Sequence, residues 1–108
     1  MTAAEMTKRL RALMKEYADF LLEVVTLERT LRARFETFAV RNALGSLSYT
    51  YSYAQGDVRA LRSLLLQASD LPPTAPCDEH IEKGLAHYRD LLDNHRRPDL
   101  ARARSASR

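Results

Sequence analysis

Apolar side chains recur through the first third of the chain at alternating steps of four and three residues. The positions that keep this spacing are Met6, Leu10, Leu13, Tyr17, Phe20, Val24, Leu27 and Leu31. Such spacing is typical of the buried seam of a coiled-coil helix. Thr2 and Glu5 fit a capping box, in which a hydroxyl and a carboxylate three residues apart satisfy unpaired N–H groups. The pattern therefore predicts one long amphipathic helix starting near the N-terminus.

This predicted helix is long for so short a chain. No glycine or proline occurs before Gly45, so it spans about 40 residues and roughly 60 Å. A compact chain of this size has a radius of gyration of only about 13 Å. The seam must be covered by the rest of the chain, by a second copy or by a partner protein. We expect a partner, with the contact made by Leu10, Leu13, Tyr17, Phe20, Val24, Leu27 and Leu31.

The positions flanking the seam disfavour a parallel pair of identical helices. Such a pair would set Glu23 of one copy beside Glu28 of the other, and like charges repel there. The other flanking contacts, between Arg9 and Met14 and between Glu16 and Leu21, carry no attraction. An antiparallel self-copy or a different helical protein is the preferred partner.

The middle of the chain also follows helical spacing, from Val40 to Ala68. Residues 45–53 alternate polar and apolar types as a strand would, but a lone strand has nothing to pair with. The chain turns either at Gly45 or at Gly56, and we favour Gly56, with Asp57 capping the next helix. Tyr49, Tyr51 and Tyr53 form either boundary packing or an aromatic contact patch.

Three prolines in residues 72–76 end the middle helix and favour a stiff turn. A last helix is expected over residues 77–95, with an apolar stripe from Ile81 to Leu92. The predicted fold is all-α and elongated. A long N-terminal helix of coiled-coil type is packed antiparallel by two shorter helices.

Composition limits the chain to one domain. It has 108 residues, 45% apolar and 29% charged, an ordinary globular balance. We assign residues 1–95 to a helical domain and residues 96–108 to a basic tail. The net charge of the whole chain is +3, and the tail alone carries +4. Its arginines could bind phosphates or an acidic partner: Arg96, Arg97, Arg102, Arg104 and Arg108.

Candidate chemistry is sparse. Cys77 and His80 could touch one metal ion, but structural zinc needs four ligands, so we expect no metal and no cofactor. The motifs of hydrolases, phosphate-binding loops and metalloproteases do not occur, so we expect neither an enzyme nor a small-molecule substrate. A single cysteine, no signal peptide and no membrane-spanning run predict an intracellular soluble protein in a reducing compartment.

These observations favour a non-enzymatic helical interaction module. It would act as a small subunit, adaptor or chaperone of a larger assembly, and its seam would be completed by a partner helix. The alternative is an accessory protein that binds anions or nucleic acid through the arginine-rich tail. An anionic membrane is a less favoured target of the same residues.

Overall fold

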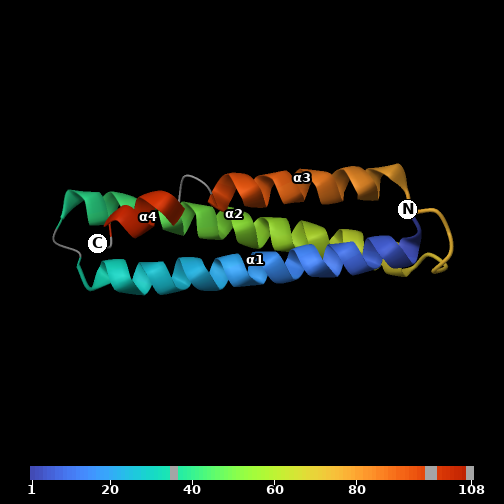
Figure 1. Ribbon diagram of the computed structural model, residues 1–108, viewed down its shortest axis with the longest axis horizontal. Coiled ribbons are helices and arrows are strands. Elements are labelled where there is room, and N and C mark those ends of the chain that lie inside the picture. The colour runs from blue at the N-terminus through green and yellow to red at the C-terminus, as the bar shows by residue number, and fades with distance from the viewer. Residues whose placement is uncertain (35–36, 97–99, 107–108) are drawn as a thin grey trace.

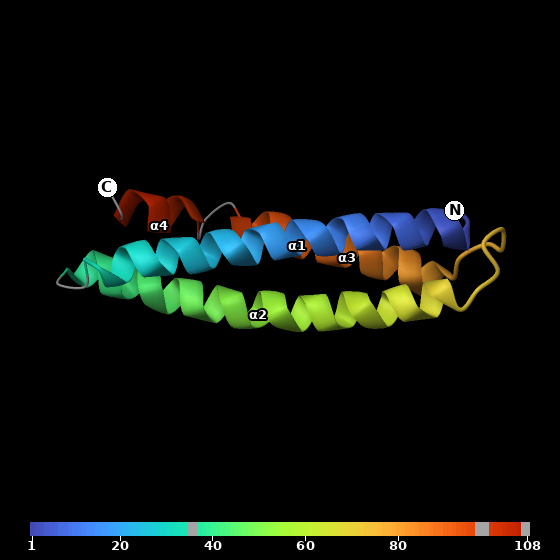
Figure 2. The ribbon, with the colours of Figure 1, turned by 90° about the horizontal axis from the view of Figure 1, so that it is seen from below.

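A computed structural model of the chain describes residues 1–34, 37–96 and 100–106. Its described residues form the helices α1 (Ala3–Arg32), α2 (Phe38–Ser69), α3 (Glu79–His95) and α4 (Ala101–Ala106). The first two make a long antiparallel hairpin, and α3 and α4 follow each other along it (Figures 1 and 2). The bundle measures 56 Å by 17 Å by 17 Å. The predicted all-α, elongated arrangement with a long first helix is confirmed.

Two sets of hydrogen bonds fix the start of α1. The predicted capping box is present, with the Thr2 hydroxyl accepting from the Glu5 N–H and the Glu5 carboxylate accepting from the Thr2 N–H. In addition, the turn between α2 and α3 supplies carbonyl groups to this end. Ala3 N–H donates to the carbonyl of Ala75 at 2.8 Å, and Ala4 N–H donates to that of Pro73 at 3.1 Å. The proline-rich turn therefore covers the helix N-terminus and satisfies N–H groups that the helix itself leaves unpaired.

The predicted turn at Gly45 or Gly56 is wrong, because α2 runs through both glycines without interruption. The chain instead reverses between Arg32 and Phe38, where Thr37 caps α2 by accepting a hydrogen bond from the Val40 N–H at 3.2 Å. A glycine inside a helix costs only about 1 kcal/mol relative to alanine, which tertiary packing easily offsets.

The long hairpin also shows how the apolar seam of α1 is covered. Because α2 has 32 residues and α1 has 30, each helix covers the other over its whole length. The radius of gyration is 16.7 Å, larger than that of a compact sphere. The rest of the chain is therefore long enough to cover the seam of α1 by itself.

The helices α3 and α4 complete the core. The start of α3 after Asp78 and its end at His95 agree with the prediction. Beyond it, Leu100 and Ala103 are buried, and α4 contacts both α1 and α2. The C-terminal segment, predicted as a separate basic tail, therefore packs on the helical hairpin over residues 100–106.

Candidate functional site

The residues predicted to contact a partner lie inside the bundle. Six of them are fully buried by the chain itself: Leu10, Leu13, Tyr17, Phe20, Val24 and Leu31. The seventh, Leu27, is half-buried and packs against the same core. As long as the bundle stays folded, a partner cannot reach the six buried side chains. Their role in the described structure is to hold α1 against the other helices.

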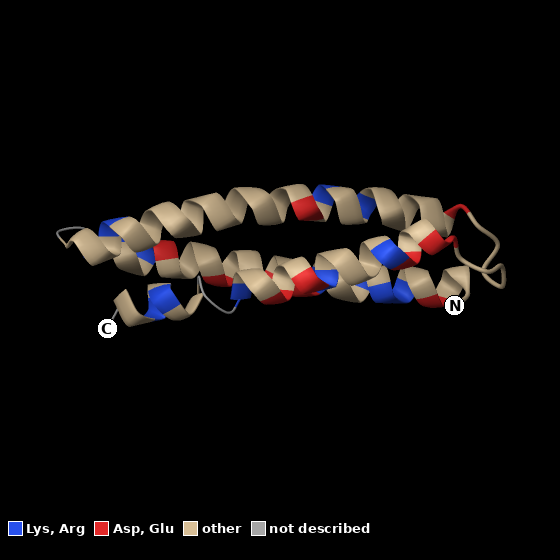
Figure 3. Ribbon diagram, turned by 90° about the horizontal axis from the view of Figure 1, so that it is seen from above, with Lys and Arg blue, Asp and Glu red and all other residues tan. Residues whose placement is uncertain are grey.

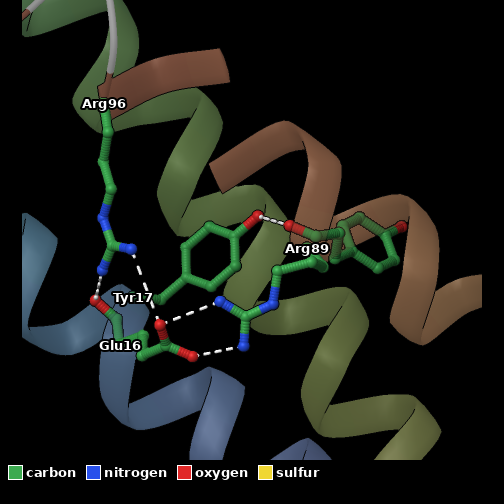
Figure 4. A network of polar contacts seen from close by, with 5 residues as sticks. Glu16, Tyr17, Arg89 and Arg96 are labelled. Carbon is green, nitrogen blue, oxygen red and sulfur yellow. Dashed lines mark hydrogen bonds and ion pairs between the residues drawn. The ribbon is translucent and has the colours of Figure 1, made fainter. Parts of the chain in front are cut away.

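A polar cluster interrupts this core near its centre. The Tyr17 hydroxyl donates to the carbonyl oxygen of Tyr88 at 2.7 Å (Figure 4). It also lies 3.1 Å from a carboxylate oxygen of Asp57, which accepts from it. His95 Nε2 lies 3.4 Å from the same Asp57 oxygen, and its ring stacks on Phe20. Burial, followed by the charge of Asp57, raises the pKa of Tyr17 well above its usual range. The cluster links α1, α2 and α3 at one point and so specifies how they align.

This cluster includes a carboxylate, an imidazole and a phenol, the side-chain types that also serve in acid–base catalysis. Here, however, the Tyr17 side chain is fully buried, and its hydroxyl is taken up by groups of the chain itself. Proton transfer to a substrate requires hydrogen-bonding distance to that substrate. The geometry therefore favours a structural role for Tyr17.

The C-terminal arginines face acidic residues of α1. Glu16 accepts from Arg89 at 2.8 Å and lies 3.5 Å from Arg96, as Figure 4 shows. The hydrogen bond from Arg89 is the main reason that the pKa of Glu16 is lowered and that of Arg89 is raised. Arg104 of α4 pairs in the same way with Glu23.

These ion pairs bear on the predicted anion-binding residues. Arg96 and Arg104 are already paired with carboxylates of α1. Arg102 is exposed, while Arg97 and Arg108 lie outside the described residues. Of the three predicted arginines that the structure describes, two are thus engaged with α1, and only Arg102 forms no ion pair with the described residues.

A second series with steps of four and three residues runs along α2 on the side away from the core. Every residue of this series is exposed. We call it the outer face of α2, and it consists of Phe38, Asn42, Gly45, Tyr49, Ser52, Gly56, Arg59, Ser63 and Leu66. The large apolar members are strongly exposed, with 78% of Phe38, 68% of Tyr49 and 63% of Leu66 accessible. The spacing is that of a helix–helix interface, yet no element of the described chain covers it.

The glycines of this face are not needed for packing within the chain. A methyl group added at Gly45 or at Gly56 would meet no atom within 4 Å. By contrast, a methyl group at Gly84 of α3 would come within 2.6 Å of a methyl of Leu64. Since helical glycine is costly relative to alanine, Gly45 and Gly56 lower the stability of the helix without improving the packing of its own bundle.

The outer face is also uncharged through its centre. Residues 42–56 contain no lysine, arginine, aspartate or glutamate, although charged residues make up 29% of the chain. Figure 3 shows this stretch of α2 in tan, without the blue or red of charged residues. Exposed aromatic rings lie there: those of Tyr49 and Tyr53 are 5.0 Å apart, beside a groove that reaches down to Asp57. A solvent-exposed helix side normally carries charges, so an exposed run without any is unusual.

The spacing of the outer face is present in the sequence, but the core residues of α2 follow the same spacing on the same helix. The expected core series of α2 included Leu44, Tyr51 and Val58, which are half-buried. The structure buries Ala43, Thr50 and Asp57 at the neighbouring positions. The predicted series is nevertheless right at Val40, Leu47, Ala54, Leu61 and Ala68, which are buried, and it misses Ala43, Thr50 and Asp57. The spacing of exposed glycines, serines and Tyr49 was the signal that could have identified the outer face.

The other candidate chemistry is not brought together. Cys77 is half-buried, and burial raises the pKa of its thiol. The His80 ring bonds to Gln67 at 2.7 Å. Within residues 1–34, 37–96 and 100–106, no three histidine, cysteine or acidic side chains gather to hold a metal ion. In the same ranges, no helix has the length and apolar character needed to cross a membrane.

Comparisons with family models, with curated proteins and with solved structures give no match for this chain.

Proposed function

We propose that this protein is a non-enzymatic helical interaction module that binds a protein helix through the outer face of α2. It would serve as a small subunit or adaptor of an assembly. One observation carries the proposal. The outer face of α2 keeps the spacing of a helix–helix interface over nine exposed positions, and two of them are glycines that the chain's own packing does not use.

The proposed contact has a simple physical basis. Gly45 and Gly56 leave the backbone bare, so a partner helix can approach α2 closely there and gain dispersion contacts. Tyr49 offers a large ring with few rotatable bonds and a hydroxyl that can stay in water. Because the centre of the face is uncharged, binding would remove few charges from water. Phe38 and Leu66 mark its two ends, where both side chains are largely exposed.

Site-specific photo-crosslinking in the native cell tests this proposal. A photoreactive phenylalanine analogue would replace Tyr49 in one variant and Leu22 in another. Leu22 is the matched control because it lies on α1 and is 67% exposed, nearly as much as Tyr49. We expect a discrete protein adduct from position 49 and not from position 22. Equal adducts from both positions, or none from position 49, would contradict the proposal.

A further inference from the structure

We infer that the outer face of α2 binds a second copy of this chain, with the two α2 helices antiparallel about a two-fold axis between Thr50 and Tyr51. The inference rests on the proposed function and specifies its partner. It follows from the order of large and small residues along the outer face. Gly45, Tyr49, Ser52 and Gly56 are separated by four, three and four residues, a spacing that is the same in both directions.

The antiparallel register sets both aromatic residues of the outer face against serines. Residues whose numbers sum to 101 face each other in this arrangement. Tyr49 then lies opposite Ser52 of the partner subunit, and Phe38 lies opposite Ser63 of the partner subunit. Gly45 lies opposite Gly56 of the partner subunit, so the backbones come close on both sides of the axis. Filling small positions with large partners is how packed helices reach the density of a protein interior.

A parallel pair would lack this fit. It would set Tyr49 against its own copy, and Arg59 against another arginine at the same level. In the antiparallel register, Arg59 faces Asn42 of the partner subunit and no charged residue. Without charges from residue 42 to residue 56, the centre of the face can meet its own copy without repulsion.

The charges at the rims give the association a recognisable salt dependence. Arg41 and Arg62 are exposed and flank the outer face towards its two ends. In the antiparallel pair, Arg41 lies near Arg62 of the partner subunit. Because salt screens such repulsion, we expect the dimer to strengthen between low and moderate ionic strength. Binding to an acidic partner would weaken over the same range.

The size of the face predicts a weak, reversible dimer. In this register the paired positions of the face run from Phe38 to Ser63, 25 residues apart, so the strip is about 38 Å long and about 10 Å wide. Its projected area of roughly 400 Å² is smaller than the roughly 800 Å² that each partner buries in a standard interface. The dimer should therefore form in the micromolar range or above, and measurements must extend to high protein concentration.

Disulfide trapping tests the register directly. In a full-length Cys77→Ser background, Gly45→Cys and Gly56→Cys are made singly, and each protein is oxidised mildly alone and after mixing. We expect the mixture to form a cross-linked dimer much faster than either protein alone. Positions 45 of the two copies are offset by 11 residues, or about 16 Å, whereas a disulfide requires Cα atoms about 4.4–6.8 Å apart. Equal cross-linking by each single variant alone would overturn the antiparallel register.

Sedimentation of the unmodified protein gives an independent measurement. We expect a concentration-dependent dimer whose dissociation constant rises at least about tenfold in Ser52→Glu, because that change places a charge in the contact. The matched control is Ala18→Glu, which adds the same charge to an exposed position of α1 and should leave the dimer unchanged. Circular dichroism must show that both variants stay helical. A protein that remains monomeric up to about 1 mM would overturn the inference.

The two proposals fail in different ways. If the photo-crosslink at Tyr49 joins a different protein while the purified chain stays monomeric, the interaction module stands and self-association is overturned. If the protein shows neither an adduct nor a dimer, both proposals are overturned.

Discussion

The seam of α1 and the outer face of α2 have the same residue spacing, but the first is buried and the second is exposed. Both alternate steps of four and three residues along a helix of about 30 residues. The α1 seam consists of large apolar residues, mostly leucines and aromatic residues, and the bundle buries nearly all of it. The outer face of α2 mixes glycine, serine and a few exposed aromatic residues, and the described chain leaves it uncovered.

This comparison shows that spacing and residue size carry different information. Spacing tells which residues share one side of a helix. Size tells how much apolar surface that side would leave in water. A side made of leucines must be buried for the chain to fold, whereas a side made of glycine and serine can remain exposed in the monomer and still accept a partner.

The most direct test of this difference is to truncate one large side chain of the α1 seam and one of the outer face of α2. Phe20→Ala should lower the free energy of unfolding by about 3–5 kcal/mol, because the ring is buried and stacks on His95. Tyr49→Ala should change it by less than about 0.5 kcal/mol, since that ring is exposed. Urea unfolding at a low protein concentration measures both. Similar losses in the two variants would show that the surfaces do not differ as described.

Tyr17→Phe tests the polar cluster inside the α1 seam. The change removes the hydroxyl that donates to Asp57 and to the Tyr88 carbonyl, and we expect a loss of about 1–3 kcal/mol. The outer face of α2 should be unaffected, so the dimer should keep its dissociation constant wherever the bundle is folded.

The same variant has a predicted signature in alkali. The folded pKa of Tyr17 is raised, so above the ordinary tyrosine value near 10 the unfolded chain releases this proton first. Stability should therefore fall as the pH rises past 10. Tyr17→Phe should fall less than the parent between pH 9 and pH 11, by about 1 kcal/mol. Parallel curves for the two proteins would contradict the buried position of this hydroxyl.

Replacing glycines with alanine tests whether the outer face of α2 is free of contacts within the chain. Gly45→Ala and Gly56→Ala should each stabilise the monomer by about 1 kcal/mol, because the added methyl meets only open space. Gly84→Ala should gain less, or lose stability, since its methyl would press on Leu64. Thermal melts of the three variants measure the difference. If all three gained equally, the outer glycines would not be distinct from the packed one.

The smallest expected effect concerns the rim of the α1 seam. Glu16 has a lowered pKa beside Arg89 and Arg96, so its contribution is present above its ordinary pKa of 4.5 and is lost as the pH falls. Glu16→Gln should cost at most about 1 kcal/mol at pH 7, because the pair is partly exposed. The difference from the parent should shrink as the pH falls below 4.5 and through the lowered pKa of Glu16. A difference that persists there would point to a role of Glu16 other than its charge.

Part of this molecule could be predicted without its structure. The repeated apolar spacing and the capping box at Thr2 led to the long first helix, and the three prolines led to the second turn. The last helix was placed within two residues of its start. These signals are local, because helix caps and proline depend only on neighbouring residues in the chain.

The first turn and the buried polar residues of α2 could not be predicted in this way. Gly56 was favoured over Gly45 as the helix break, and only the packing of α2 along α1 shows that neither is used. The burial of Asp57 was also hidden, because a carboxylate enters a core only where groups such as the Tyr17 hydroxyl and the His95 ring meet it.

The amino-acid sequence by itself thus determined the class of fold and the residues that cannot remain in water, because hydrophobic spacing and end caps act over a few residues. Tertiary structure decided which surface was left over. The α1 seam was predicted to face a partner, yet α2 is long enough to cover it. Whether a helix side is core or contact surface depends on which other segments reach it, and those segments lie 40 or more residues away in the chain for contacts such as Tyr17 with Asp57.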